Sequence, residues 1–188
     1  MLQIKKRNIV SAMLALTMML SISVTALAST VNVTRVRQAK SNWCWAATSE
    51  MVGRSVNRSS TMTQWDVVGY VKGSNYPNVG GTSEDMKKGI AYASANTVSY
   101  TFGRTLSWDD HKSNIESGYP IAVWVDWYGG GAHALACAGT QTISGNNYLY
   151  IIDPWENNAS TWYKYDALKN GTRIQSGVGQ YDYSFWKR

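Results

Sequence analysis

Cysteine and histidine, which together can supply a nucleophile and its base, each occur only twice in this chain. The cysteines are Cys44 and Cys137, and the histidines are His111 and His133. A cysteine attacks a carbonyl group as its thiolate, and it needs a nearby base, which is most often histidine. The sequences around these four residues therefore indicate whether the chain has a nucleophilic site.

Cys44 lies close to the expected start of a helix. Ser41 or Asn42 can cap this helix, which we expect to end near Ser55. Free backbone N–H groups and the helix dipole lower the pKa of a thiol at such a position, which favours the thiolate. The sequence therefore predicts a nucleophile at Cys44. The competing interpretation is a buried helix cysteine with core tryptophans on either side.

Two neighbours of Cys44 can complete a site around a reacting carbonyl group. Gln38 lies six residues earlier, just before the helix. Its side-chain amide can donate a hydrogen bond to an oxyanion, beside the backbone N–H of Cys44 itself. Trp45 follows Cys44 directly and can form a wall of the site.

Of the two candidate bases, His133 has the more suitable surroundings. It opens an apolar stretch over 132–140 directly after three glycines at 129–131. We expect a strand that starts at the rim of a cleft, where the glycines let a substrate backbone pass close by. The competing interpretation is a hydrogen-bonded histidine at the end of a hairpin. His111 lies between two charged residues of an expected helix over 108–117, where we expect it to face solvent.

A third group usually fixes the tautomer and orientation of a catalytic histidine. Asp153 follows an expected strand over 148–152 and comes twenty residues after His133. If this strand and the preceding one form a hairpin around a turn near 144–147, His133 and Asp153 lie at the same end of it. The competing interpretation is an Asp-Pro turn that merely ends the strand. Weaker substitutes for the third group are Asp126 and Asn147.

These motifs resemble those of papain-like cysteine proteases. Gln38, five intervening residues and the pair Cys44-Trp45 resemble the nucleophile region of that family, in which the glutamine forms the oxyanion hole. The run Asn-Trp-Cys-Trp-Ala-Ala at 42–47 resembles the compact bacterial branch typified by AvrRpt2-type and C39-like peptidases. Trp155 resembles the tryptophan that lies just beyond the third residue of the family's triad.

The resemblance implies a triad in which Cys44 is the nucleophile, His133 the base and Asp153 the orienting group, in the family's chain order. It also implies an oxyanion hole at Gln38 and walls at Trp45 and Trp155. We therefore predict a secreted cysteine endopeptidase that hydrolyses peptide bonds. It would act on a protein or peptide substrate, and we expect it to be a monomer.

Three other functions remain open at this point. Cell-wall amidases of the NlpC/P60 or CHAP type also use cysteine and histidine, although their nucleophile usually lies in a different local sequence. A transglutaminase-like acyltransferase shares Cys-Trp, His and Asp, and a noncatalytic binding protein is the third class. A disulfide between Cys44 and Cys137 would remove the nucleophile. We expect Cys137, four residues beyond His133, to be a buried core thiol instead.

Residues 1–28 have the pattern of a secretory signal peptide. Lys5, Lys6 and Arg7 precede an apolar run over 9–27, and the segment ends in Ala-Leu-Ala, a small-residue cleavage pattern. We predict cleavage near Ala28, secretion of residues 29–188, and no stable membrane association afterwards. An uncleaved membrane anchor is the alternative.

Residues 29–188 predict one α+β domain, with helices first and an antiparallel sheet second. The expected helices lie at about 41–55, 63–72, from Thr82 or Ser83 onward, and 108–117, and the expected strands at 121–125, 132–140, 148–152, 161–165 and 180–185. With the resemblance, this order implies a papain-like two-lobed domain in which N-terminal helices pack on a C-terminal sheet, with the substrate in a cleft between them.

Composition excludes several other functions. The net charge of the chain is +6, and without residues 1–28 it falls to +3, with no Lys/Arg cluster of the kind that binds phosphates. Nucleic acid is therefore not an expected partner. Two cysteines and two histidines, all far apart, give no zinc spacing, and no phosphate-binding loop occurs. We predict no cofactor and no metal.

Overall fold

The structure is a computed structural model that describes residues 28–155, 157 and 160–188. The signal peptide predicted for residues 1–28 lies outside the described residues except for its last position, Ala28. In the part of the chain that is described, every helix falls short of the length and apolar character that crossing a bilayer requires.

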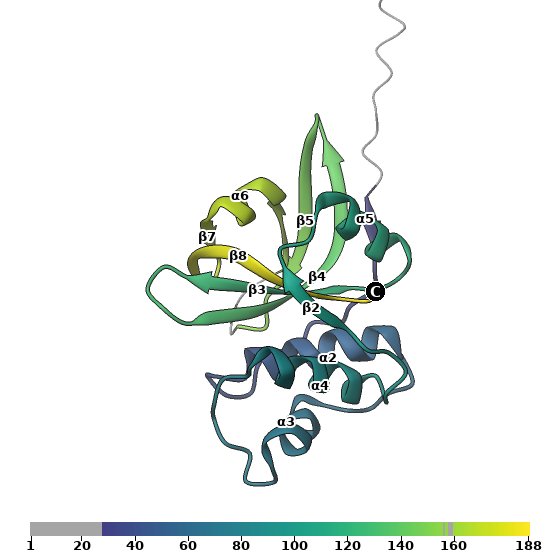
Figure 1. The fold of residues 1–188 in the computed structure, drawn as a ribbon, viewed down its shortest axis with the longest axis vertical. Helices are drawn as coiled ribbons and strands as arrows, with labels where there is room; N and C mark the ends of the chain where they lie inside the picture. Colours follow the sequence, from purple (N-terminus) through teal and green to yellow (C-terminus); the bar gives the residue numbers. More distant parts are fainter. Residues whose placement is uncertain (1–27, 156, 158–159) are drawn as a thin grey trace, which may run out of the picture.

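Three helices form one lobe of the domain, the lower one in Figure 1. They are α2 (Cys44–Val56), α3 (Gln64–Lys72) and α4 (Ser83–Ala93). The last two start where the sequence predicts, each with a capping box. Thr63 exchanges hydrogen bonds with Asp66, and Thr82 does so with Asp85.

The start of α2 differs from the prediction. Its N-cap is Trp43, which makes no side-chain capping hydrogen bond within the described residues, so Cys44 is the first helical residue. The two predicted caps, Ser41 and Asn42, instead bind the loop between α3 and α4. Asn42 Nδ2 donates to the Asn78 carbonyl at 3.0 Å, and Asn78 Nδ2 donates to Ser41 Oγ at 2.9 Å. The capping prediction was wrong because these side chains fasten a loop.

An antiparallel sheet forms the second lobe, in the strand order β2-β8-β3-β4-β5-β6 (Figure 1). The strands are β2 (Thr101–Arg104), β3 (Ile121–Trp127), β4 (Ala132–Ile143), β5 (Asn146–Ile152), β6 (Thr161–Lys164) and β8 (Gly177–Trp186), with β1 (Ser29–Thr30) paired to β4 and β7 (Thr172–Ile174) paired to β8. Helices α5 (Trp108–Glu116) and α6 (Tyr165–Asn170) pack against this sheet. The predicted α+β class is therefore confirmed.

Each of the five predicted strands corresponds to an observed one, but four short elements were not predicted. These are β1, β2, β7 and α6. The strand predicted to end at Tyr165 ends one residue earlier, because Tyr165 begins α6 and its hydroxyl donates to the Leu106 carbonyl at 2.7 Å.

Successive side chains of β4 point to opposite faces of the sheet and so belong to two different cores. Ala134, Ala136 and Ala138 belong to the core shared with α2, α3 and α4. Leu135 and Cys137 belong to the core on the opposite face of the sheet, beneath α5 and α6. Alanine side chains leave room for a helix to approach the strand closely, so this pattern brings the start of α2 against β4.

The expectation that His111 faces solvent was wrong. Its side chain is fully buried on α5, with Nδ1 2.9 Å from the Ser107 carbonyl oxygen and Nε2 3.0 Å from the Tyr181 hydroxyl. His111 lies on the same helix face as the buried Ile115, four residues later, and this face packs on the sheet. The charged residues beside it, Asp110 and Lys112, are the ones exposed to solvent.

Candidate active site

The start of α2 places Cys44 against the first residues of β4, an interior strand of the sheet. Thr48, one turn later on the same helix, donates from Oγ1 to the Ala134 carbonyl at 3.0 Å and so fastens α2 to β4. The sulfur of Cys44 accepts hydrogen bonds from the backbone N–H groups of Trp45 and Ala134. One donor comes from each lobe, so the sulfur lies where the helices meet the sheet.

His133, the second residue of β4, lies between Cys44 and Asp153. Its Nε2 is 2.8 Å from Asp153 Oδ1, and the ring also forms a hydrogen bond with Cys44. Because Asp153 occupies Nε2, Nδ1 is the ring nitrogen that faces the sulfur. Trp127 stacks on the imidazole at 5.6 Å with an interplanar angle of 19°, and the Trp155 ring meets it edge-on at 6.1 Å. The imidazole is therefore held in one orientation.

The electrostatics of this group favour an ion pair. Burial by itself would raise the pKa of the Cys44 thiol, but the hydrogen bond and charge of His133, with the two backbone N–H groups, hold that pKa below its usual 9.0. Burial by itself would lower the pKa of His133, but hydrogen bonds to Asp153 and Cys44 and their negative charges raise it to about 9. The arrangement thus favours thiolate and imidazolium together.

Asp153 remains ionised in this setting. Burial alone would raise its pKa, but the hydrogen bond and charge of His133, with the Trp155 N–H, hold that pKa below its usual 3.8. The Trp155 N–H donates to Asp153 Oδ1 at 2.8 Å. The structure therefore brings together Cys44, His133 and Asp153, which the sequence predicted as a triad.

Sequence reasoning missed the residue that holds the Asp153 turn. The Arg35 guanidinium donates to the Asp153 carbonyl at 2.8 Å and to the Trp155 carbonyl at 2.5 Å. The Gln38 backbone N–H donates to the Pro154 carbonyl at 2.9 Å. The segment before α2 thus lies along the turn, and no local sequence signal marks Arg35 for this contact.

Gln38 lies beside the start of α2, but both N–H groups of its side chain are engaged. Its Nε2 donates to the Lys40 carbonyl at 2.9 Å and to the Ser41 carbonyl at 2.8 Å. Its Oε1 is buried and, within the described residues, has no hydrogen-bond partner. Donation by this amide to an oxyanion therefore stays a prediction, and it would require one of these two hydrogen bonds to open.

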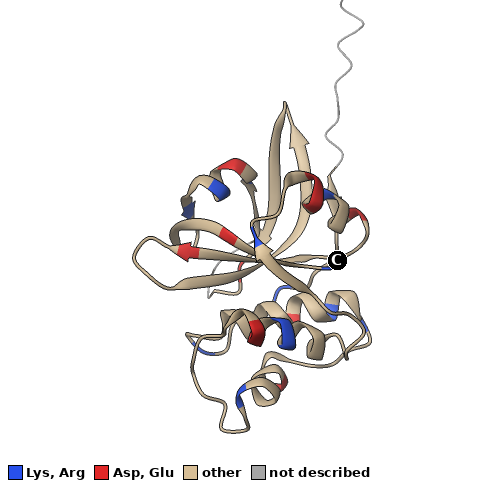
Figure 2. Ribbon diagram, in the orientation of Figure 1, with Lys and Arg blue, Asp and Glu red and all other residues tan. Residues whose placement is uncertain are grey.

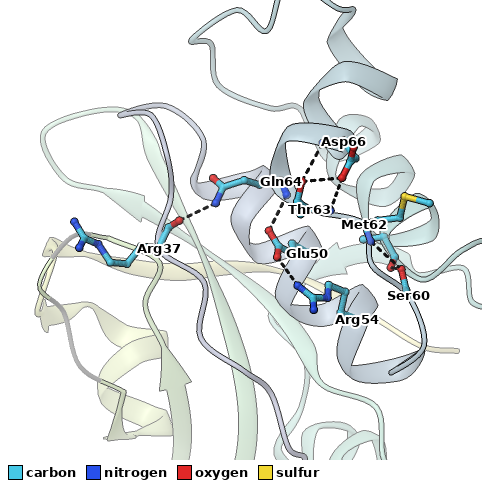
Figure 3. Close-up of polar contacts among 9 residues, drawn as sticks. Arg37, Glu50, Arg54, Ser60, Met62, Thr63, Gln64 and Asp66 are labelled. Atoms are coloured by element: carbon cyan, nitrogen blue, oxygen red, sulfur yellow. Dashed lines mark hydrogen bonds and ion pairs between the residues drawn. The ribbon is translucent and has the colours of Figure 1, made fainter.

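The backbone around Gln38 is held by a polar cluster at the start of α3 (Figure 3). Gln64 Nε2 donates to the Arg37 carbonyl at 2.7 Å, and Gln64 Oε1 accepts from the Ala39 N–H at 2.7 Å. The buried Glu50 carboxylate accepts from the Gln64 N–H at 2.7 Å and pairs with Arg54 at 2.9 Å. One glutamine thus fixes the residues on both sides of Gln38, a role that no sequence pattern indicated.

Cys44 and His133 open into a cleft of about 310 Å³. The residues that line it come from the start of α2, the loop before α4, the β3–β4 turn and the turns after β5 and β7: Ser41, Asn42, Cys44, Gly80, Trp127, Gly131, Ala132, His133, Trp155 and Ser176. Trp155, which is 42 % exposed, lines the cleft, and so does Trp127, which the sequence did not single out.

Trp45 does not form the wall that the sequence predicted. Its side chain is buried, and it is not among the residues that line the cleft. It turns away from Cys44 and packs beneath the loop at Gly81, where an added Cβ would lie 2.5 Å from the indole ring. Its Nε1 donates to the Val79 carbonyl at 3.2 Å. Its contribution to the cleft is the backbone N–H that binds the Cys44 sulfur.

The second cysteine is separate from this site. Both thiols are free, and Cys137 is fully buried in the core under α5 and α6, so the predicted core thiol is present and the disulfide alternative is not. Within the described residues, no group of three or more His, Cys, Asp or Glu side chains is arranged to hold a metal ion.

Fold and family together define the class of this protein as a cysteine-type peptidase. The chain belongs to the Peptidase_C39-like family, whose model matches residues 30–178. A comparison with curated proteins gives no significant match. The AvrRpt2-type part of the resemblance stays a prediction that rests on residues 42–47.

Two solved structures share the papain-like fold. One is a double glycine motif protease from an AMS/PCAT transporter in complex with the leader peptide, at 13 % identity and a TM-score of 0.51, covering 85 % of this chain and 95 % of that one. The other comes from work on the mite allergens Blo t 1 and Der p 1, at 15 % identity and a TM-score of 0.53, covering 89 % of this chain and 73 % of that one. Such low identities establish the fold alone.

Proposed function

We propose that this protein is a secreted endopeptidase that hydrolyses peptide bonds with a Cys44–His133–Asp153 triad. The observation that carries the proposal is the continuous line of hydrogen bonds from the Cys44 sulfur through the His133 ring to the Asp153 carboxylate, buried at one end of an open cleft. A thiolate, a proton donor and an orienting carboxylate are the groups that acyl transfer from a peptide bond requires.

In the first half of the reaction, the Cys44 thiolate attacks the carbonyl carbon of the scissile peptide bond. The resulting oxyanion accepts a hydrogen bond from the Cys44 backbone N–H at the start of α2. Gln38 turns one side-chain N–H from its carbonyl partner toward the same oxygen. His133 then gives its proton to the departing nitrogen, the C–N bond breaks, and an acyl thioester and a free amine remain.

In the second half, water replaces the amine. The neutral His133 takes a proton from water as the oxygen attacks the thioester carbonyl. The C–S bond then breaks to release the carboxylic acid product and restore the thiolate with its imidazolium. Asp153 orients the ring in both halves, and its negative charge stabilises the protonated form.

Secretion is supported by residues 1–28, which have the charged start, the apolar run and the Ala-Leu-Ala end of a signal peptide. The structurally similar double glycine motif protease was solved in complex with a leader peptide, which supports a peptide as the substrate of this protein. We propose that the mature domain acts outside the cell, as a monomer, without stable membrane association.

The test uses the full chain, exported by a bacterial host and purified from the medium. The mass of the purified protein should correspond to cleavage near Ala28. Hydrolysis of casein and of quenched fluorescent peptides should occur with the unchanged chain and with Cys137→Ala, but should fall below detection with Cys44→Ala, which removes the nucleophile. Circular dichroism checks that Cys44→Ala is folded.

The alternative functions give different results in the same preparation. A cell-wall amidase would release fragments from peptidoglycan and leave casein intact. A transglutaminase-like acyltransferase would incorporate a fluorescent amine into a glutamine peptide. Peptide hydrolysis that persists in Cys44→Ala would refute the proposed triad.

A further inference from the structure

A second cavity adjoins the catalytic cleft on the side of β3. It has a volume of about 620 Å³ and shares Trp127, Gly131 and Ala132 with the cleft. These shared residues lie beside His133, and Trp127 stacks on its ring. A peptide whose scissile bond lies at Cys44 would therefore place the side chain of a nearby residue in this cavity.

Half of the residues that line the cavity are aromatic. Phe102, Trp124, Trp127 and Tyr183 line it, and Phe102 stacks on Tyr183 at 5.2 Å. Aromatic faces bind apolar side chains, and they also attract cations through the negative charge of the ring faces. The walls alone thus admit two classes of side chain.

Asp126 decides between these classes, because it is the one charged residue among those that line the cavity. It lies on β3 directly opposite Ala132, the residue before His133. An apolar side chain that filled the cavity would remove this carboxylate from water and give it no partner, which is costly. A cationic side chain would instead supply the partner.

Two carboxyl groups and one guanidinium group meet around Asp126. Asp182 on β8 faces it, and Figure 2 shows acidic positions on these two strands close to each other. Burial, followed by the charge and hydrogen bond of Asp182, raises the pKa of Asp126, and the single opposing cation, Arg104, only partly offsets this. Arg104 lies 4.7 Å from the centre of the Tyr183 ring and is not among the residues that line the cavity.

We propose that the cavity binds a lysine or arginine side chain of the peptide substrate, with Asp126 as its counter-charge. The inference rests on the proposed peptidase function, whose substrate class it narrows to peptides with a basic residue close to the scissile bond. The position of Arg104 over Tyr183 indicates how a guanidinium group fits this aromatic wall.

The test uses the secreted protein and quenched fluorescent peptides that are identical except at one position. Each of the four positions before the scissile bond carries Arg, Lys, Leu, Phe or Glu in turn. At one position, kcat/KM for Arg and Lys should exceed that for Leu by about tenfold or more, which is the size expected for one charge-assisted contact. The Asp126→Asn variant should reduce this ratio to about one.

Asp109→Asn is the matched control, because it removes the same charge from an exposed position on α5 and should keep the wild-type ratio. The rate at which iodoacetamide alkylates Cys44 is measured in each variant to show that the catalytic pair is intact. A preference for Leu or Phe at every position, or an unchanged ratio in Asp126→Asn, would overturn the inference and leave the proposed peptidase function standing. Failure to hydrolyse any peptide would reject that function, and the inference with it.

Discussion

The chain places one cysteine and one histidine in each of two regions, and the two regions treat these residues in opposite ways. In the cleft between the lobes, Cys44 lies beside His133. In the core beneath α5 and α6, Cys137 and His111 each lie near the buried Tyr181. Three of the four side chains are buried and Cys44 is partly buried, so burial alone does not distinguish the regions.

The two regions differ in the groups that contact these cysteine and histidine side chains. His133 has a carboxylate on one side and a thiolate on the other, and its pKa is raised to about 9. His111 contacts the Ser107 and Leu106 carbonyls and the Tyr181 hydroxyl, and it feels the charge of Asp110, but burial prevails and its pKa falls to about 4. Cys137 donates only to the Gly139 carbonyl, and burial raises its pKa to about 12. Of these four side chains, the two that face an opposite charge are thus the two for which the charged form is favoured.

The sharpest test of this comparison is the relative reactivity of the two thiols. With a pKa of about 12, about one Cys137 side chain in 10⁵ is ionised at pH 7, and it is also inaccessible. Cys44 should therefore react with iodoacetamide more than about 10⁴ times faster. Mass spectrometry of the two cysteine peptides measures both rates, and in strong denaturant the rates should become equal. Comparable rates in the native protein would contradict the comparison.

The two histidines should differ almost as much in their effect on turnover. His133→Gln removes the proton donor and should lower kcat/KM by about 10³-fold, whereas His111→Gln should keep about the wild-type value. The measurement is the hydrolysis of one quenched peptide by both variants. A large loss of activity in a well-folded His111→Gln variant would show that the buried histidine also takes part in the chemistry.

The pH dependence of the same assay reports on the His133 side of the ion pair. In the proposed mechanism, protonated His133 is the acid for the leaving amine, and its pKa is about 9. Activity should therefore fall as the pH rises through about 9. The acid limb of the profile should lie below 9.0, the usual pKa of a thiol, because that of Cys44 is lowered.

The triad could be predicted because each member carries a local signal. Cys44 lies at a helix start, His133 follows three glycines, and counting back from one turn brings Asp153 to the same end of a hairpin as His133. These signals involve neighbours in the chain or a single hairpin. The register of β4 and β5 contains a bulge near 137–139, but the two residues still meet at 2.8 Å.

The supporting residues could not be predicted because their contacts join distant parts of the chain. Arg35 binds the turn at 153–155, and Gln64 binds the backbone on both sides of Gln38. Such contacts depend on how the lobes pack, which no local pattern encodes. The side chain of Trp45 is a similar case, because the neighbouring loop at Gly81 determines which way it turns.

His111 was misjudged for a different reason, and the correct signal was present. The expected helix is polar, with charged residues on both sides of the histidine, and this suggested a solvated face. Ile115 lies four residues later and shares the buried face, which is the spacing that marks one side of a helix. The apolar residue four positions away lies on the same helix face as His111, so it was the better guide to burial. The two charged residues next to His111 in the sequence lie on other faces and say little about it.

The smallest expected effect concerns stability in acid. The pKa of His111 is about 4 in the folded protein and 6.5 in an unfolded chain, so between these values the unfolded chain binds more protons. The contribution of His111 to the free energy of unfolding is fully present above pH 6.5. It is lost as the pH falls toward 4, by roughly 3 kcal/mol in total. The groups that act on it are the Ser107 and Leu106 carbonyls, the Tyr181 hydroxyl and Asp110, and of these Asp110 carries the charge that opposes this loss.

The two histidines can be separated in this measurement, because His133 acts with the opposite sign. Its raised pKa adds stability that is fully present below 6.5 and is lost as the pH rises through about 9, so it stays constant across the window in which His111 titrates. Urea unfolding at pH 7 and pH 5 should show a clear loss in the unchanged chain and a smaller one in His111→Gln, whose side chain stays neutral. Equal losses in both proteins would mean that carboxylates, rather than the buried imidazole, set the acid limit of the fold.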